Sequence, residues 1–266
     1  MRKRGLVAGV LLATLTLVSG CAQSVDPIER LGKKAAERVH GSYPGSPGGT
    51  TGRAGSPGGT TGIPLPPVLD RVPTTDPVVF LTYDDGAERD PRFIDMVREL
   101  RLPVSMFLTD SVVGPGYGHF ARLRSVGADI QNHTLHHAAL RGLPYAGQRA
   151  EICGQQDKLK ARFGHRPRLF RPPYGTYDRT TLRAAADCGV AAVVLWRAVM
   201  TPAGLAYTHG SHRLLPGDIV AMDSDETAGP ALRERTVRVL REAQERGLTV
   251  GRLEDYLQRA TSRGRP

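Results

Sequence analysis

From residue 77 onward, short apolar runs alternate with longer segments in which apolar positions recur every three or four residues. The runs are typical of buried strands, and the periodic segments are typical of amphipathic helices. This alternation favours a parallel sheet flanked by helices. We expect strands at residues 78–82, 104–108, 128–131, 169–170, 190–195 and 218–222, and helices at 91–102, 120–126, 148–163, 179–188 and 231–246.

The number of these units points to the fold class. Six or more strands with their helices, within about 190 residues, favour a small, distorted or incomplete (β/α) barrel over an open doubly wound α/β sheet. No glycine-rich phosphate loop follows any of the expected strands, so the sequence gives no support for nucleotide binding.

The amino terminus has the pattern of an export signal. Arg2, Lys3 and Arg4 precede the uncharged run 5–18, which is too short to span about 30 Å of hydrocarbon. Residues 18–21, Val-Ser-Gly-Cys, resemble a bacterial lipobox. We therefore expect a signal peptide over residues 1–20, a lipid on Cys21 and a membrane-anchored protein on the outer face of the cell membrane. The alternative is an ordinary signal peptide with a chance cysteine.

A change of composition follows Cys21. Residues 21–75 are rich in Gly, Ser, Pro and Thr, and the octapeptide at 45–52 recurs unchanged at 55–62. Such a segment cannot bury enough apolar surface to offset its chain entropy. We expect a flexible tether over residues 21–75 and a folded domain over residues 76–262, held away from the membrane.

Charge narrows the choice of partner only slightly. The 266 residues carry 36 Lys and Arg against 26 Asp and Glu, a formal net charge of +10. Excess positive charge promotes contact with anionic polymers in general. The basic residues are scattered, with no compact block outside residues 2–4, so we expect no nucleic-acid partner. A charged fraction of 23% excludes a polytopic membrane protein, and we take a monomer as the default.

Polar residues gather where expected strands end, which in a barrel is where the chemistry lies. Asp84-Asp85-Gly86 follows the first strand, residues 132–137 follow the third, residues 171–175 follow the fourth, and Asp223 ends a later one. Taken singly, each has an ordinary explanation as a turn, a surface histidine pair or a structural arginine. On one helical turn, His133 and His137 would present both imidazoles to a metal.

Together, these segments resemble a known family. Thr82-Tyr83-Asp84-Asp85-Gly86, His133-Thr134-Leu135-His136-His137 and Arg171-Pro172-Pro173-Tyr174 are similar, in this order, to three motifs of the polysaccharide deacetylases. This family is also called the NodB-homology domain or carbohydrate esterase family 4. The resemblance covers residues 77–257 and implies the barrel of that family, with a polysaccharide as substrate.

The resemblance also implies roles for single residues. Asp85, His133 and His137 would bind a divalent metal, usually zinc, although two histidines and a carboxylate also accept cobalt or nickel. Asp84 would be the general base, and Arg171 would orient it and keep it ionised. The backbone N–H of Tyr174 would help to stabilise the oxyanion, Trp196 belongs to the fourth motif beside the substrate, and the Thr134 hydroxyl would fix the metal-binding loop.

Two later motifs depart from the family pattern. Trp196 is present, but the carboxylate expected in its motif is missing, and Asp223 stands where the family has the histidine that acts as general acid. An isolated aspartate, with an ordinary pKa of about 3.9, is ionised at pH 7 and is a poor proton donor. Asp225 and Glu226 nearby could change that, or His209 or His212 could reach the site.

Three functions therefore stay open. The first is a metal-dependent amide hydrolase that deacetylates an N-acetylated wall polysaccharide, peptidoglycan first by location, with Asp223 as an atypical acid. The second is an O-acetyl esterase with the same site, because an alkoxide leaves more readily than an amine anion. The third is a weak or inactive relative that binds wall polysaccharide. The remaining cysteines, Cys153 and Cys188, flank the Arg171 strand and are expected to form a disulfide.

Overall fold

The computed structural model describes residues 63–86, 89–223 and 231–257. The expected signal peptide, Cys21 and the tether up to residue 62 lie outside the described residues. The helices are α2 (Pro91–Glu99), α3 (Asp110–Val113), α4 (Tyr117–Ser125), α5 (Tyr145–Phe163), α6 (Arg179–Asp187) and α7 (Leu232–Glu245), with short 3-10 turns η1 (Gly114–Gly116) and η2 (Pro173–Gly175). The strands are β1 (Val68–Leu69), β2 (Val78–Tyr83), β3 (Val104–Leu108), β4 (Asp129–Asn132), β5 (Leu169–Phe170), β6 (Ala192–Val194), β7 (Ala198–Thr201), β8 (Gly204–Tyr207), β9 (Ile219–Met222) and β10 (Thr249–Val250).

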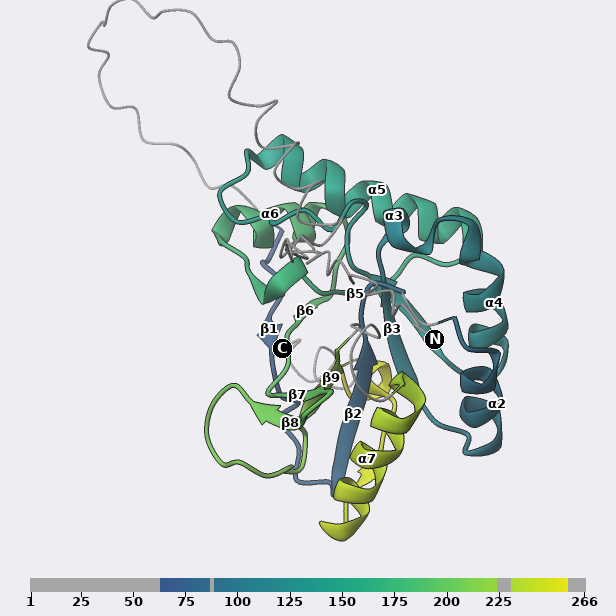
Figure 1. The fold of residues 1–266 in the computed structure, drawn as a ribbon. Coiled ribbons are helices and arrows are strands. Elements are labelled where there is room, and N and C mark those ends of the chain that lie inside the picture. The colour runs from purple at the N-terminus through teal and green to yellow at the C-terminus, as the bar shows by residue number, and fades with distance from the viewer. Residues whose placement is uncertain (1–62, 87–88, 224–230, 258–266) are drawn as a thin grey trace, which may run out of the picture. The chain divides into compact units, whose positions relative to one another are not determined.

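These strands form one mostly parallel sheet. Its order is β1-β6-β5-β4-β3-β2-β9-β7-β8, with β10 beside the start of β2, and only the β7–β8 pair is antiparallel. The six residues of β2 are all buried, which explains why this strand reads as an unbroken apolar run in the sequence. Helices α2, α4, α5, α6 and α7 lie around the outside of the strands (Figure 1).

The connection between β6 and β7 shows that the sheet curls. The two strands are six places apart in the sheet order, which is about 29 Å at the usual strand spacing. Only residues 195–197 separate them in sequence, and four residue steps span at most about 14 Å. The sheet therefore curls into an open, distorted barrel, and the expected α/β fold class is confirmed.

The folded domain begins before the expected boundary at residue 76. Strand β1 pairs in parallel with β6, and Val72 is buried in the core with Phe80 and Ile219. Residues 63–75 thus belong to the folded domain rather than to a tether. Their few apolar positions, among prolines, gave too little periodicity to indicate a strand.

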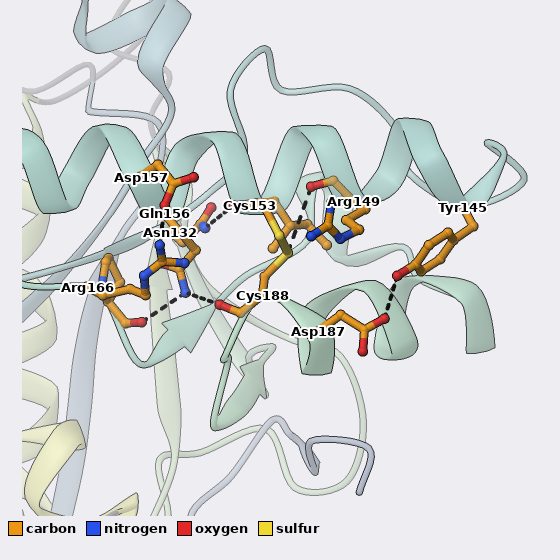
Figure 2. Close-up of a disulfide and its surroundings, with 11 residues drawn as sticks. Asn132, Tyr145, Arg149, Cys153, Gln156, Asp157, Arg166, Asp187 and Cys188 are labelled. Carbon is orange, nitrogen blue, oxygen red and sulfur yellow. Dashed lines mark hydrogen bonds and ion pairs between the residues drawn. A yellow bond between two sulfur atoms is a disulfide. The ribbon is translucent and has the colours of Figure 1, made fainter. Parts of the chain in front are cut away.

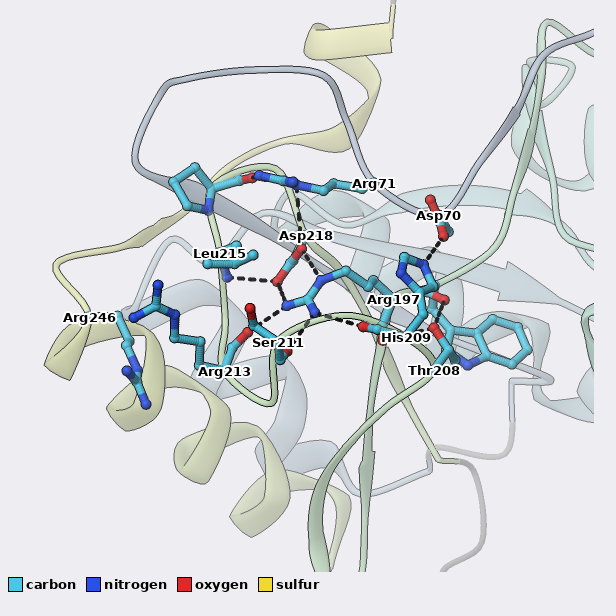
Figure 3. A network of polar contacts seen from close by, with 12 residues as sticks. Asp70, Arg71, Arg197, Thr208, His209, Ser211, Arg213, Leu215, Asp218 and Arg246 are labelled. Atoms are coloured by element: carbon cyan, nitrogen blue, oxygen red, sulfur yellow. Dashed lines mark hydrogen bonds and ion pairs between the residues drawn. The ribbon is translucent and has the colours of Figure 1, made fainter.

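A buried ion pair fixes the bend between β6 and β7. Arg197 donates to both carboxylate oxygens of Asp218, with 2.6 Å from Nε to Oδ1, and its remaining N–H groups bond to carbonyls of residues 209–213 (Figure 3). The hydrogen bond with Asp218 raises the pKa of Arg197. This pair ties the segment after β8 to the start of β9.

Most expected elements are present within a few residues of their limits. The sequence interpretation missed β1, α3, β10 and the β7–β8 hairpin, all of them four residues long or shorter. Within the described ranges, none of the helices combines the length and the apolar character needed to span a bilayer.

Candidate active site

The sheet brings the three family-like segments to one edge. Strands β2, β3, β4 and β5 are consecutive parallel neighbours. Asp84 and Asp85 follow β2, residues 133–137 follow β4, and Arg171 follows β5. Since parallel strands end at the same edge, side chains far apart in sequence meet there.

Asp85, His133 and His137 form a compact cluster. Oδ1 of Asp85 lies 3.5 Å from Nε2 of His133 and 3.2 Å from Nε2 of His137. One ligand atom from each residue lies within 4.8 Å of those of the other two. Three such atoms around a common point match the two-histidine, one-carboxylate donor set that borderline divalent cations accept.

The ring of His133 is held in the orientation that ligation requires. Its Nδ1 lies 2.7 Å from the carbonyl oxygen of Arg171, which can only accept a hydrogen bond. The proton therefore lies on Nδ1, and the lone pair of Nε2 points toward Asp85. The Thr109 hydroxyl donates to the carbonyl of His133 at 2.8 Å and fixes the backbone as well.

The two histidines approach one another through a loop, not through a helical turn. Residues 133–137 are irregular, and Thr134 and His137 have φ values of 73° and 56°, in the left-handed region. The expectation of a shared helical face was wrong. As expected, the Thr134 hydroxyl braces this loop, accepting the N–H of His137 at 3.1 Å. Asn132, which the sequence placed in this segment without a role, accepts the N–H of Thr134 at 2.8 Å through Oδ1.

Asp84 and Arg171 form an ion pair beside this cluster. Nη1 of Arg171 donates to Oδ1 of Asp84 at 2.7 Å. Nε and Nη2 donate to the carbonyls of Val194 and Leu195 at 3.2 and 3.1 Å, and the guanidinium lies 4.4 Å from the ring centre of Phe107. Burial lowers the pKa of Arg171, and the charge of Asp84 and its hydrogen bond act in the opposite direction. These contacts fix the orientation of the guanidinium, and with it the position of the Asp84 carboxylate.

Tyr174 and Trp196 line the same region. The ring of Tyr174 lies 4.7 Å from that of His137, and the residue is 56% exposed with a backbone φ of 59°. Trp196 lies 5.3 Å from the guanidinium of Arg171. Its ring is 3.1 Å from the position that a Cβ on Gly175 would take, so only glycine fits there without displacing the indole. An exposed aromatic ring beside the cluster suits a sugar substrate.

Asp223 follows strand β9 at the level at which Asp84 follows the neighbouring strand β2. Met222 pairs with Tyr83, so the next residues, Asp223 and Asp84, begin adjacent loops at the same edge. Asp225 and Glu226, expected as its neighbours, lie outside the described residues.

The two histidines considered as alternative acids have partners elsewhere. His209 bonds through Nε2 to Asp70 at 2.6 Å, and the ring of His212 packs on Tyr207. Neither Asp70 nor Tyr207 belongs to the cluster of Asp85, His133 and His137 or to the pair of Asp84 and Arg171.

Fold and site together define an α/β domain of distorted-barrel type with a candidate metal site at the carboxyl edge of its strands. Residues 71–193 match the model of the polysaccharide deacetylase family. This stretch, a little under half of the chain, is thus similar to that family, and a solved structure of similar fold is a family 4 carbohydrate esterase from Bacillus anthracis.

Three curated relatives are similar to the chain in sequence, over very different shares of its length. An uncharacterised protein of Streptomyces coelicolor is 56% identical over 260 residues, 96% of this chain and 98% of that one. A chitin deacetylase of Amylomyces rouxii is 36% identical over 43% of this chain. A peptidoglycan-N-acetylglucosamine deacetylase of Bacillus cereus is 27% identical over 41% of it. The matches span only 27% and 40% of the last two proteins.

Solved structures share the fold. A family 4 carbohydrate esterase from Streptomyces lividans, in complex with acetate, has a TM-score of 0.54 and 25% identity, over 65% of this chain and 91% of that one. A pseudoenzyme of the same family from Bacillus anthracis has a TM-score of 0.61 and 18% identity, over 72% and 69%.

Proposed function

We propose that this protein is a metal-dependent hydrolase that removes acetyl groups from an N-acetylated cell-wall polysaccharide, with peptidoglycan as the first candidate. The observation that carries the proposal is the juxtaposition of the Asp85, His133 and His137 cluster with the pair of Asp84 and Arg171. A hydrolase of this family needs a metal site and a general base side by side. A relative that no longer catalysed hydrolysis need not keep both.

The residues divide the chemistry among them. Asp85, His133 and His137 would hold a divalent cation, zinc first and cobalt or nickel as alternatives, which supplies Lewis acidity to water and to the acetyl carbonyl. Asp84 accepts a proton from the attacking water, and Arg171 keeps that carboxylate ionised and aimed. The backbone N–H of Tyr174 donates to the oxyanion, and Trp196 packs beside the substrate.

Departure of the amine needs a proton, and we assign that step to Asp223, which would donate it from its protonated form and regain a proton from solvent after each turnover. Its backbone begins the loop next to that of Asp84, which supports a position at the same substrate. The replacement of the family histidine by Asp223 also favours a second candidate, an O-acetyl esterase, since an alkoxide leaves without prior protonation. The likeness to a pseudoenzyme of the family keeps a third, a wall-binding relative with little activity.

The proposed substrate follows from the proposed location of the protein. The basic and apolar start of the chain, with Cys21 after small residues, supports export and a lipid anchor on the outer face of the membrane. The nearest N-acetylated polymer there is peptidoglycan, and two of the curated relatives deacetylate chitin and peptidoglycan, as their names state. We propose a monomer that acts on the wall and has no nucleic-acid partner.

The deciding experiment follows acetate release by the full-length protein loaded with zinc. The substrates are an N-acetylglucosamine oligosaccharide, a peptidoglycan fragment and an O-acetylated xylan. Release from the two amides, abolished by a chelator, supports the proposal. Release from the ester alone makes the protein an esterase, and no release from any substrate while zinc stays bound leaves the wall-binding function.

A further inference from the structure

One turn of helix α5 packs against the loop that carries the two histidines, here called the metal loop (residues 132–137). Glu151 accepts two hydrogen bonds from His136, at 2.9 Å from the backbone N–H to Oε2 and at 2.7 Å from ring Nδ1 to Oε1. The carbonyl of Ile152 accepts the side-chain N–H of Asn132 at 2.9 Å.

Two further residues of this turn contact the same region. Gly154 lies so close to Leu135 that a Cβ would meet Leu135 Cδ1 at 2.5 Å. Gln155 donates through Nε2 at 2.6 Å to the carbonyl of Leu108, which also accepts the N–H of His133. Four of five consecutive residues on α5 thus contact the metal loop or the strand end beneath it.

The fifth residue of the turn, Cys153, anchors it from the other side. Its disulfide to Cys188 joins α5 to the end of α6, and Figure 2 shows this bond beside Asn132 and Gln156. Gln156 adds a hydrogen bond to the carbonyl of Pro167 at 3.0 Å. The turn is therefore a fixed surface against which the metal loop can be held.

We infer that Glu151 is a positioning residue for the metal site, acting by fixing the centre of the metal loop through its two hydrogen bonds to His136. The inference rests on the proposed function in one respect: Asp85, His133 and His137 must hold the cation. The ring of His136 bonds to α5 and is not one of the three clustered side chains, although His136 lies between the two expected histidine ligands in sequence.

The backbone of the metal loop explains why it needs such a hold. Thr134 and His137 lie in the left-handed region, which costs non-glycine residues free energy unless surrounding contacts impose it. A loop released at its centre would relax toward ordinary backbone angles, and His133 and His137 would move apart. Groups that orient metal ligands from outside typically account for ten- to hundredfold in metal affinity.

The test measures zinc affinity of the full-length protein by competition with a chromogenic chelator, independently of any substrate. We expect Glu151→Ala to weaken zinc binding at least about tenfold. Glu151→Gln, which keeps one oxygen acceptor for the backbone N–H of His136, should lose no more than about threefold. The matched control is Asp157→Ala, which removes a carboxylate of the same helix that is paired with Arg166 and should leave zinc affinity unchanged.

Melting of the metal-free proteins separates positioning from general stability. The positioning role is supported if metal-free Glu151→Ala has the same melting temperature as metal-free Asp157→Ala but binds zinc more weakly. Zinc affinity equal to that of the unmodified protein would overturn it. If Glu151→Ala does not fold, His136→Ala decides: at least threefold weaker zinc binding supports the role, and no change refutes it. Failure of the unmodified protein to bind zinc would instead count against the proposed function.

Discussion

Asp84 Oδ1 lies 2.7 Å from Nη1 of Arg171, and this arginine is completely buried, with its other N–H groups bonded to backbone carbonyls. A guanidinium fixed in this way has little freedom to follow a moving carboxylate. Asp84 is therefore held in place before any substrate arrives, which is the property a general base needs.

Replacing Asp84 by Asn keeps the shape of the side chain and its acceptor oxygen for Arg171 but removes the base. We expect acetate release to fall by about a hundredfold or more, with zinc affinity within a factor of a few, because Asp84 is not among the three ligands. Initial rates and zinc titration on the same preparation provide the measurement. The control is Asp157→Asn, and undiminished release by Asp84→Asn would remove Asp84 from the mechanism.

Asp223 can be tested as the proton donor by two substitutions. If Asp223 protonates the leaving amine, Asp223→Asn should reduce release from an N-acetyl substrate by about a hundredfold and release from an O-acetyl ester far less. Asp223→His, which installs the residue typical of the family, should restore amide hydrolysis. Both rates are compared on paired amide and ester substrates.

Two results would count against this assignment. Equal loss on amide and ester after Asp223→Asn would indicate a general structural effect. An unchanged amide rate would show that another group donates the proton.

How far the sequence predicts the site depends on the range of the interactions involved. Asp84 and Asp85 follow the long apolar run of β2, and Arg171 follows the short apolar pair Leu169-Phe170, so their placement at one edge followed from the alternation of strands and helices. The conformation of the metal loop could not be predicted in this way. The spacing of His133 and His137 indicates a helix, and only the structure shows the left-handed backbone angles of Thr134 and His137.

Outside the family-like motifs and the cysteines, contacts between distant segments could not be predicted. Glu151 is one of two carboxylates on α5, and only the packing of this helix brings it to His136. Strand β1 likewise depends on pairing with β6, more than 120 residues later, and not on its own two residues. The Cys153–Cys188 disulfide, in contrast, was predicted and is confirmed, because the chain has only three cysteines and these two are the pair within the expected domain.

That disulfide should contribute measurably to the stability of the domain. It closes a loop over a sequence separation of 35 residues, for which chain entropy gives about 4 kcal/mol of stabilisation. We expect Cys153→Ser/Cys188→Ser to unfold at a correspondingly lower denaturant concentration. Reductant should shift the midpoint of the unmodified protein and leave that of the double variant unchanged. A reductant-insensitive midpoint in both, or two free thiols in the folded oxidised protein, would contradict the bond.

Glu254 should make stability depend on pH near neutrality. Its Oε1 accepts hydrogen bonds from Ser105 at 2.8 Å and from Gln131 at 3.0 Å, and it lines a cavity of about 280 Å³ at the amino-terminal ends of β4, β5 and β6. Burial, together with the charge of Asp129, raises the pKa of Glu254 to about 7 from an ordinary value of 4.5. His165, Arg166 and Arg168 face the same cavity.

A carboxyl group whose pKa is higher in the folded protein favours folding while it is protonated. That contribution is fully present below about pH 4.5 and is lost as the pH rises through about 7, up to about 3 kcal/mol for this shift. Glu254→Gln retains an acceptor oxygen and cannot ionise. We therefore expect the stability of the unmodified protein to fall relative to Glu254→Gln between pH 4.5 and 8, measured by urea denaturation at each pH. Parallel stability curves for the two proteins would show that Glu254 titrates normally.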